Sequence, residues 1–196
     1  RLCSSAEHAV DDGYNYIIIS DRGVDARKAP IPSLLAMAAV HHHLIHCRKR
    51  AQTAVVVESG EVCEVMHVAL LIGYGASAVN PYMAFGILGK LVEEKSIQLD
   101  YPSARDHYIQ AINKGMLKIL SKMGISTIRS YRGAALVESL GVSSSVLDRY
   151  IGGGLSQIEG ITMEDIASDI VSAHSAAYRG ENGDGNGVAA SLEDYG

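Results

Sequence analysis

The sequence has few cysteines, no long hydrophobic run and no block of charge of one sign. Cys3, Cys47 and Cys63 are scattered and odd in number, which argues against a disulfide framework and favours reduced thiols in the cytoplasm. The longest apolar runs, such as residues 68–72, are too short to span a membrane. With 17 basic and 22 acidic side chains, the net charge is −5. We therefore expect no membrane contact and no nucleic-acid partner.

An initiator methionine is also missing, because the first residue is Arg1. The residues after Arg1 do not form the basic segment and apolar segment that are typical of a secretion signal. A chain of 196 residues with 47% hydrophobic side chains is long enough for one domain and a tail. We expect it to be an internal piece of a longer protein.

Short runs rich in β-branched residues alternate with longer stretches of helical composition. The runs predict strands at residues 15–21, 53–59, 78–80 and 125–131. Helices are predicted at residues 32–49, 61–75, 82–95 and 103–124, the last with Ser103 and Asp106 as a capping box. Parallel neighbours need long crossover connections. The pattern therefore predicts an α/β fold with short parallel strands, resembling part of a βα-barrel.

Beyond residue 132 the pattern changes to short helical segments and then to a tail. Helices are predicted at residues 133–141, 143–151 and 161–178. Ser145 with Asp148, and Thr162 with Asp165, are the expected capping pairs of the last two. Residues 179–196 are rich in glycine and polar side chains, so we expect a flexible linker after a structured segment of residues 1–178.

The run AVHHHLIHC, residues 39–47, suggests a metal site. His42 and His46 share one face of the predicted helix, and His43 with His46 or Cys47 is an alternative pair. However, no third ligand follows at a suitable spacing, and His43 stands where a metalloprotease helix would carry glutamate. Three consecutive histidines also point in different directions. A structural role without a metal is therefore the expectation.

Two glycine clusters and one basic cluster could contact a ligand. Gly73 and Gly75 end a predicted helix and lead into a predicted strand, the reverse of a dinucleotide loop. Neither they nor Gly152, Gly153 and Gly154 have the lysine of a phosphate loop. A turn or helix end explains both clusters better. Three basic residues flank the predicted strand at residues 125–131, namely Lys122, Arg129 and Arg132. They could bind an anion or form salt bridges, and the sequence leaves both roles open.

Three long stretches resemble the central domain of glutamate synthase. They are APIPSLLAMAAVHHHLI, VVVESGEVCEVMHVALLIGYGASAVNPYMA and KGMLKILSKMGISTIRSYRGAALVESLG. The resemblance extends from about residue 17 to about residue 170. In that family, the large subunit makes glutamate from glutamine and 2-oxoglutarate, and its central domain lies between an amidotransferase domain and an FMN-binding barrel. The resemblance implies a non-catalytic linking segment that holds two active sites in register.

The resemblance implies no catalytic, cofactor-binding or metal-binding residue in this chain. The family's glutaminase nucleophile is an N-terminal cysteine, whereas this chain begins with Arg1. FMN and a 3Fe-4S cluster would belong to the neighbouring barrel, and ferredoxin or an NAD(P)H-linked subunit would supply electrons. The segment SYRGA, residues 130–134, is the expected interdomain contact. Two alternatives remain: an independent metal-dependent enzyme using His42 and His46, and a stand-alone βα ligand-binding domain.

Overall fold

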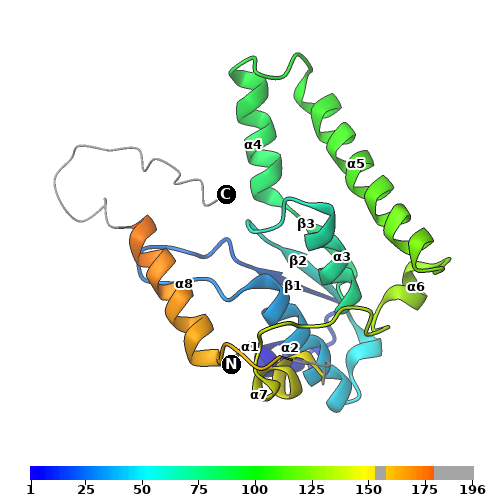
Figure 1. The fold of residues 1–196 in the computed structure, drawn as a ribbon, viewed down its shortest axis with the longest axis vertical. Helices are drawn as coiled ribbons and strands as arrows, with labels where there is room; N and C mark the ends of the chain where they lie inside the picture. The colour runs from blue at the N-terminus through cyan, green and yellow to red at the C-terminus, as the bar shows by residue number, and fades with distance from the viewer. Residues whose placement is uncertain (153–157, 179–196) are drawn as a thin grey trace.

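A computed structural model describes residues 1–152 and 158–178, in which three parallel strands alternate with helices (Figure 1). This arrangement confirms the predicted α/β fold. The expected linker at residues 179–196 lies outside the described residues, as do Gly153 and Gly154. The described elements are α1 Leu2–Asp11, β1 Tyr16–Ser20, α2 Ser33–His46, η1 Arg50–Gln52, β2 Ala54–Glu58, α3 Val65–Gly73, β3 Ala78–Asn80, α4 Tyr82–Glu93, α5 Tyr101–Lys122, α6 Ile128–Tyr131, α7 Ser144–Val146, η2 Leu147–Ile151 and α8 Met163–Ala177.

The sheet has the strand order β1-β2-β3, so each strand lies beside the next one in the chain. Helix α2 connects β1 to β2, and α3 connects β2 to β3. The register aligns the last residues of the three strands, because Ser20 pairs with Glu58 and Glu58 pairs with Asn80. Consecutive neighbouring strands with helical crossovers occur both in an arc of a βα-barrel and in one half of a doubly wound sheet.

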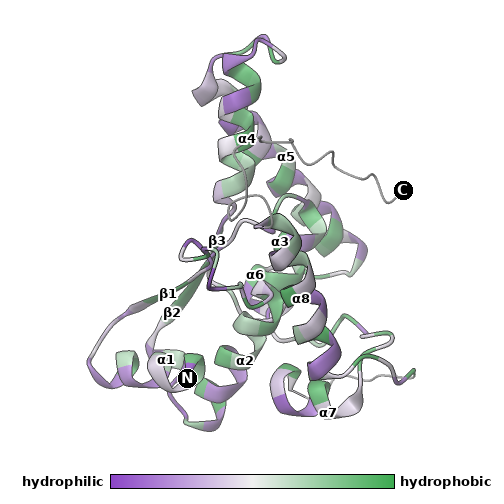
Figure 2. Cartoon of the chain, turned by 90° about the vertical axis from the view of Figure 1, so that its left-hand side faces the viewer, coloured by the Kyte–Doolittle hydropathy of each residue, from purple (hydrophilic) through white to green (hydrophobic). Residues whose placement is uncertain are grey.

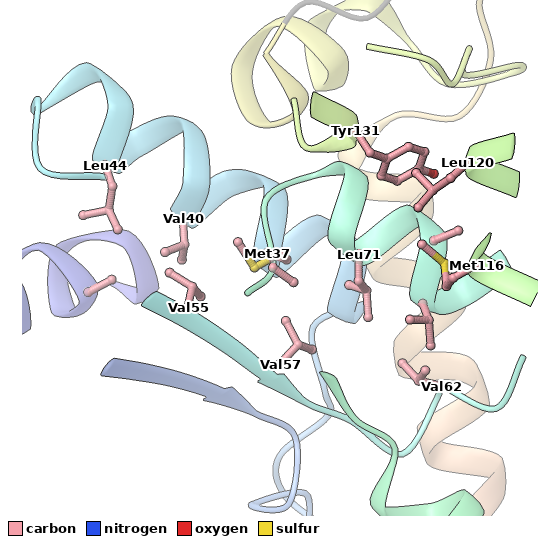
Figure 3. Packing of buried hydrophobic residues seen from close by; sticks show 14 of the residues in the cluster. Met37, Val40, Leu44, Val55, Val57, Val62, Leu71, Met116, Leu120 and Tyr131 are labelled. Carbon is pink, nitrogen blue, oxygen red and sulfur yellow. The ribbon is translucent and has the colours of Figure 1, made fainter. Parts of the chain in front are cut away.

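The hydrophobic core joins one face of the sheet to α2, and α1, α3 and α5 contribute further buried residues. Val40 and Leu44 of α2 are fully buried, as is Val55 of β2, and Figure 3 shows these side chains in one cluster. Burying each such side chain contributes about 1.5–3 kcal/mol to stability. On the opposite face of β1, Tyr16 and Ile18 keep 72% and 64% of their surface exposed. The described helices therefore leave part of this sheet face uncovered.

Helices α4 and α5 extend together away from the sheet (Figure 1), and hydrophobic and hydrophilic residues alternate along them (Figure 2). The prediction for the start of α5 was wrong, because the helix begins at Tyr101 with Asp100 as its N-cap. Pro102 in the first turn favours this earlier start, since its missing N–H is not needed there. Among the described residues, no helix is long and apolar enough to cross a membrane.

The strand predicted at residues 125–131 is instead a turn followed by the short helix α6. The Thr127 hydroxyl accepts a hydrogen bond from the backbone N–H of Ser130 at 3.3 Å and caps this helix. Such local capping competes with strand formation. Tyr131 then packs in the core, where one of its ring carbons lies near Gly73. The β-branched composition of the segment misled the prediction.

The helix predicted at residues 133–141 was also wrong. Gly133, Ala135 and Gly141 all have positive φ angles, and the backbone N–H of Gly133 donates to Gly73 O at 2.8 Å. Positive φ angles interrupt a right-handed helix. The segment therefore runs as an irregular connection.

The helices predicted at residues 143–151 and 161–178 are both present, as α7 with η2 and as α8, but their predicted capping pairs have different outcomes. Ser143 is the N-cap of α7, so the predicted pair of Ser145 and Asp148 was wrong. The capping box of Thr162 and Asp165 at the start of α8 is confirmed, with hydrogen bonds in both directions.

Candidate functional site

The histidine run lies in the second half of α2, where its imidazoles contact different neighbours. His41 is buried, and its Nδ1 accepts a hydrogen bond of 2.9 Å from Arg50 Nε. His46 Nδ1–H donates to the carbonyl oxygen of His42 at 2.7 Å within the same helix. The structure therefore does not favour a metal site built on His42 and His46.

His43 instead belongs to a cluster that joins α1 to α2. Its Nε2 lies 2.8 Å from Glu7 Oε2 and 3.7 Å from Cys47 Sγ. Lys49 Nζ lies 2.8 Å from the other oxygen of Glu7 and 2.7 Å from Asp11 Oδ1. The pairing of His43 with Cys47 was one of the alternatives predicted from helical spacing. Glu7 could not be predicted, because it comes from a different helix.

The charges in this cluster affect one another. Lys49 and His43 lower the pKa of Glu7 to about 2, so its carboxylate is ionised at neutral pH. Burial and the neighbouring Glu7 raise the pKa of the Cys47 thiol. The Glu7 carboxylate, the His43 imidazole and the Cys47 thiol thus form one compact group, with ligand atoms within 4.8 Å of one another, between α1 and α2.

Gly75 and Gly152 have positive φ angles and allow close approach to histidine rings. A Cβ at Gly75 would overlap the His41 ring, and one at Gly152 would overlap the His42 ring. Gly75 also follows the end of α3, which fits the predicted turn rather than a phosphate loop. These glycines are required by packing and backbone conformation.

The basic residues predicted around residues 125–131 do not form one group with a common environment. Lys122 and Arg129 are exposed, whereas Arg132 is half-buried. Arg132 Nε is buried and has no hydrogen-bond partner among the described residues. Burial is the main cause that lowers the pKa of His41 to about 4, and Arg50 and Arg132 lower it further. Arg50 and Arg132 therefore place two positive charges near His41.

A second polar cluster lies where the three strands end. Glu58 Oε2 accepts a hydrogen bond from the Ser20 hydroxyl at 2.7 Å. Glu58 Oε1 accepts from Asn80 Nδ2 at 3.1 Å and pairs with Arg22 Nε at 2.8 Å. Ser20 and Arg22 are the main causes that keep the pKa of Glu58 below its usual value. Both carboxylate oxygens are therefore engaged by neighbouring side chains.

Asp21 extends the same cluster into the loop after β2. Its carboxylate accepts from the Ser59 hydroxyl at 2.7 Å and from the backbone N–H of Gly60 at 2.9 Å. Burial and Asp21 raise the pKa of Tyr82 to about 12. The Arg22 guanidinium lies 4.2 Å from the centroid of the Tyr82 ring, a cation–π distance. The cluster fixes the loops after β1 and β2 and the start of α4.

The second cluster was not predicted, although the sequence contains a signal for it. Asp21, Glu58 and Asn80 stand at or directly after the end of a predicted strand. Carboxyl ends of parallel strands meet at one edge of a sheet, which is where α/β proteins place their ligands. Polar residues near the ends of the first three predicted strands would have identified the cluster.

Comparisons with known proteins identify one family and several related sequences. The family model described as the glutamate synthase central domain matches residues 1–143. The chain is 43% identical over 178 residues to the glutamate synthase [NADPH] large chain of Bacillus subtilis (strain 168), covering 91% of this chain and 12% of that protein. It is 43% identical to the glutamate synthase [NADH] of Schizosaccharomyces pombe, covering 91% of this chain and 8% of the relative.

A third relative has a different electron donor in its name. The ferredoxin-dependent glutamate synthase of Pyropia yezoensis is 38% identical over 190 residues, covering 91% of this chain and 12% of that protein. This chain thus spans about a tenth of the length of the relatives it matches. On the match to the family model, the chain belongs to the glutamate synthase central domain family.

Proposed function

We propose that this chain is a non-catalytic linking segment within the central domain of a glutamate synthase large subunit. The complete enzyme would make L-glutamate from L-glutamine and 2-oxoglutarate, by transfer of ammonia and flavin-dependent reduction. In this proposal, residues 1–178 form the central-domain segment and residues 179–196 form a linker toward the FMN-binding domain. The segment would hold the amidotransferase and FMN-binding domains at fixed positions.

The main support for a non-catalytic role is the pairing within the cluster at the strand ends. Glu58 accepts from three side chains, and Asp21 accepts from Ser59 and Gly60. A general base needs a carboxylate oxygen within hydrogen-bond reach of a substrate proton. These carboxylates instead tie the loops together, as expected of a scaffold.

The proposal assigns cofactors and partners to the complete protein and none to this segment. FMN and a 3Fe-4S cluster would be bound by the following domain. Relatives named for NADPH, NADH and ferredoxin all match this chain, so either class of electron donor fits. The unpaired Cys3, Cys47 and Cys63 support a reducing compartment such as the cytoplasm. The half-buried Arg132 in the SYRGA segment supports an interdomain contact there.

The substitution Glu58→Gln tests this proposal in the complete polypeptide. It keeps the shape of the side chain but removes the charge that pairs with Arg22. We expect glutamate formation to change less than about twofold, while the melting temperature falls. Loss of a general acid or base would instead lower the rate by about a hundredfold or more. Such a loss at an unchanged melting temperature would contradict the proposal, and Glu93→Gln at an exposed site of α4 is the matched control.

A further inference from the structure

We propose that Glu7, His43 and Cys47 form a binding site for a zinc ion that joins α1 to α2. The three side chains offer a carboxylate oxygen, an imidazole nitrogen and a sulfur, and these atoms all lie within 4.8 Å of one another. It is the one such group among the residues that the structure describes. The site is separate from the cluster at the strand ends and does not depend on the proposed function.

The distances between the donor atoms are close to those around a tetrahedral zinc ion. Usual zinc–ligand bond lengths place an oxygen and a nitrogen ligand about 3.3 Å apart, and a nitrogen and a sulfur ligand about 3.6 Å apart. The observed separations are 2.8 Å between Glu7 Oε2 and His43 Nε2, and 3.7 Å between His43 Nε2 and Cys47 Sγ. A small outward movement of Glu7 would admit the ion. The fourth position would be filled by water.

The types of ligand favour zinc over magnesium or calcium. Thiolate and imidazole are ligands of zinc and related transition metals, whereas magnesium and calcium prefer sets of oxygen ligands. Ionised Glu7 and a Cys47 thiolate would balance the two positive charges of zinc. All three ligand residues are half-buried, so the ion would reach them from the surface.

Lys49 occupies a position that supports the site instead of blocking it. Its ammonium binds Oε1 of Glu7, while Oε2 of Glu7 faces His43. Asp11 holds the same ammonium at 2.7 Å. A hydrogen bond to one oxygen of a ligand carboxylate fixes the direction of the other oxygen. The second oxygen of Glu7 therefore remains directed toward His43 and Cys47.

Zinc binding at this site requires the loss of one proton from the protein. The S–H bond of Cys47 breaks, the sulfur donates its electron pair to zinc, and the proton passes to water. Without the ion, His43 Nε2–H donates to Glu7 Oε2. Binding of Nε2 to zinc breaks this N–H bond, and the ring carries a proton on Nδ1 instead, exchanged through water. No oxidant or reductant takes part.

A second cysteine–histidine pair in the same chain provides an internal control. Cys63 Sγ lies 3.8 Å from His67 Nδ1, and the two residues are four apart, as are His43 and Cys47. Cys63 is exposed and does not belong to the group with a third ligand. If the carboxylate is essential, zinc should bind at Cys47 and not at Cys63.

The test measures how fast N-ethylmaleimide modifies each cysteine in the complete polypeptide, followed by mass spectrometry of peptides. After treatment with a chelator, zinc at about 10 µM should slow modification of Cys47 at least about tenfold, because a metal-bound thiolate is a poor nucleophile. Modification of Cys63 should change less than about twofold. An unchanged rate at Cys47 would overturn the proposal, and so would equal protection of both cysteines.

Two variants test the role of the carboxylate. Glu7→Gln keeps the size of the side chain and should weaken zinc protection of Cys47 at least about tenfold. Asp11→Asn removes the other carboxylate on Lys49 and should leave protection within about threefold of the original. If both variants protect Cys47 as well as the unchanged protein does, Glu7 is not a ligand. The measurement on the unchanged protein decides the proposal even if a variant fails to fold.

Discussion

At the scale of single residues, His41 is a titratable group that lies buried in the folded chain. It is 8% exposed, and Arg50 Nε donates a hydrogen bond to its Nδ1, which requires an unprotonated nitrogen. Burial, followed by the charge of Arg50, lowers the pKa of His41 from 6.5 to about 4. The folded state therefore resists protonation of His41 in a range where the unfolded chain accepts a proton.

This difference predicts how stability depends on pH. Above about pH 6.5 His41 is neutral in both states, and its contribution to stability is complete. As the pH falls from about 6.5 to about 4, the free energy of unfolding should fall by at most about 1.4 kcal/mol per pH unit from this residue. Urea unfolding of the chain at several pH values measures the slope.

The control for this prediction replaces the imidazole. His41→Asn removes the titrating group, so the slope over the same pH range should become shallower by up to about 1.4 kcal/mol per pH unit. His8→Asn, on the exposed part of α1, is the matched control for the same substitution outside the core. Parallel slopes for the original chain and His41→Asn would mean that the His41 pKa is not lowered.

The proximity of two residues in a cluster was predictable only where both lie close together in the sequence. His43 and Cys47 are four apart on a helix, so their proximity followed from helical spacing. Glu7 approaches them through the packing of α1 on α2, which no local pattern reveals. The cluster of Asp21, Glu58 and Asn80 is an intermediate case. Its residues come from different strands, so predicting their proximity requires the information that these strands are parallel neighbours.

At the scale of secondary-structure elements, the contact between α3 and α5 depends on one glycine. Gly115 lies inside α5, and a Cβ built there would overlap the side chain of Val65 at the start of α3. Glycine inside a helix is unfavourable relative to alanine by about 1 kcal/mol. Its presence here is explained by the close approach of the two helices.

The substitution Gly115→Ala should therefore destabilise the chain despite the better helix propensity of alanine. Overlap with Val65 should lower the free energy of unfolding by about 1–3 kcal/mol, as in other overpacked cores. In the double variant with Val65→Ala, the added methyl group finds space, so the two effects should not be additive. Gly86→Ala on α4, where a Cβ meets no atom within 4 Å, should instead be neutral or stabilising. Thermal unfolding of the unchanged chain, the single variants Gly115→Ala, Val65→Ala and Gly86→Ala, and the double variant measures these differences.

The sequence predicted elements well where hydrophobic pattern and local signals agreed. Strands β1 and β2 were identified from β-branched runs, and the start of α8 from its capping box. Residues 125–131 have the composition of a strand, but the Thr127 cap and the buried Tyr131 give a short helix. Composition indicates that a segment can be buried, whereas its hydrogen-bond and packing contacts determine its conformation.

At the scale of the whole molecule, the described residues have the features of one part of a larger assembly. Tyr16 and Ile18 expose most of their surface on the sheet face opposite the core. Helices α4 and α5 extend from the sheet, with Ile87 and Leu117 more than half exposed (Figure 1). Together with coverage of about a tenth of its relatives, these surfaces fit a linking segment within a long chain.

The most direct test of the linking role follows the amide nitrogen of glutamine in the complete polypeptide. Glutamine labelled with heavy nitrogen at the amide is supplied with 2-oxoglutarate and a reduced donor, and the label is measured in new glutamate and in free ammonia. If the segment holds the two active sites in register, as proposed, Gly115→Ala should raise the share of label lost as ammonia at temperatures below its melting temperature. An unchanged share, with Gly86→Ala as the control, would contradict the linking role.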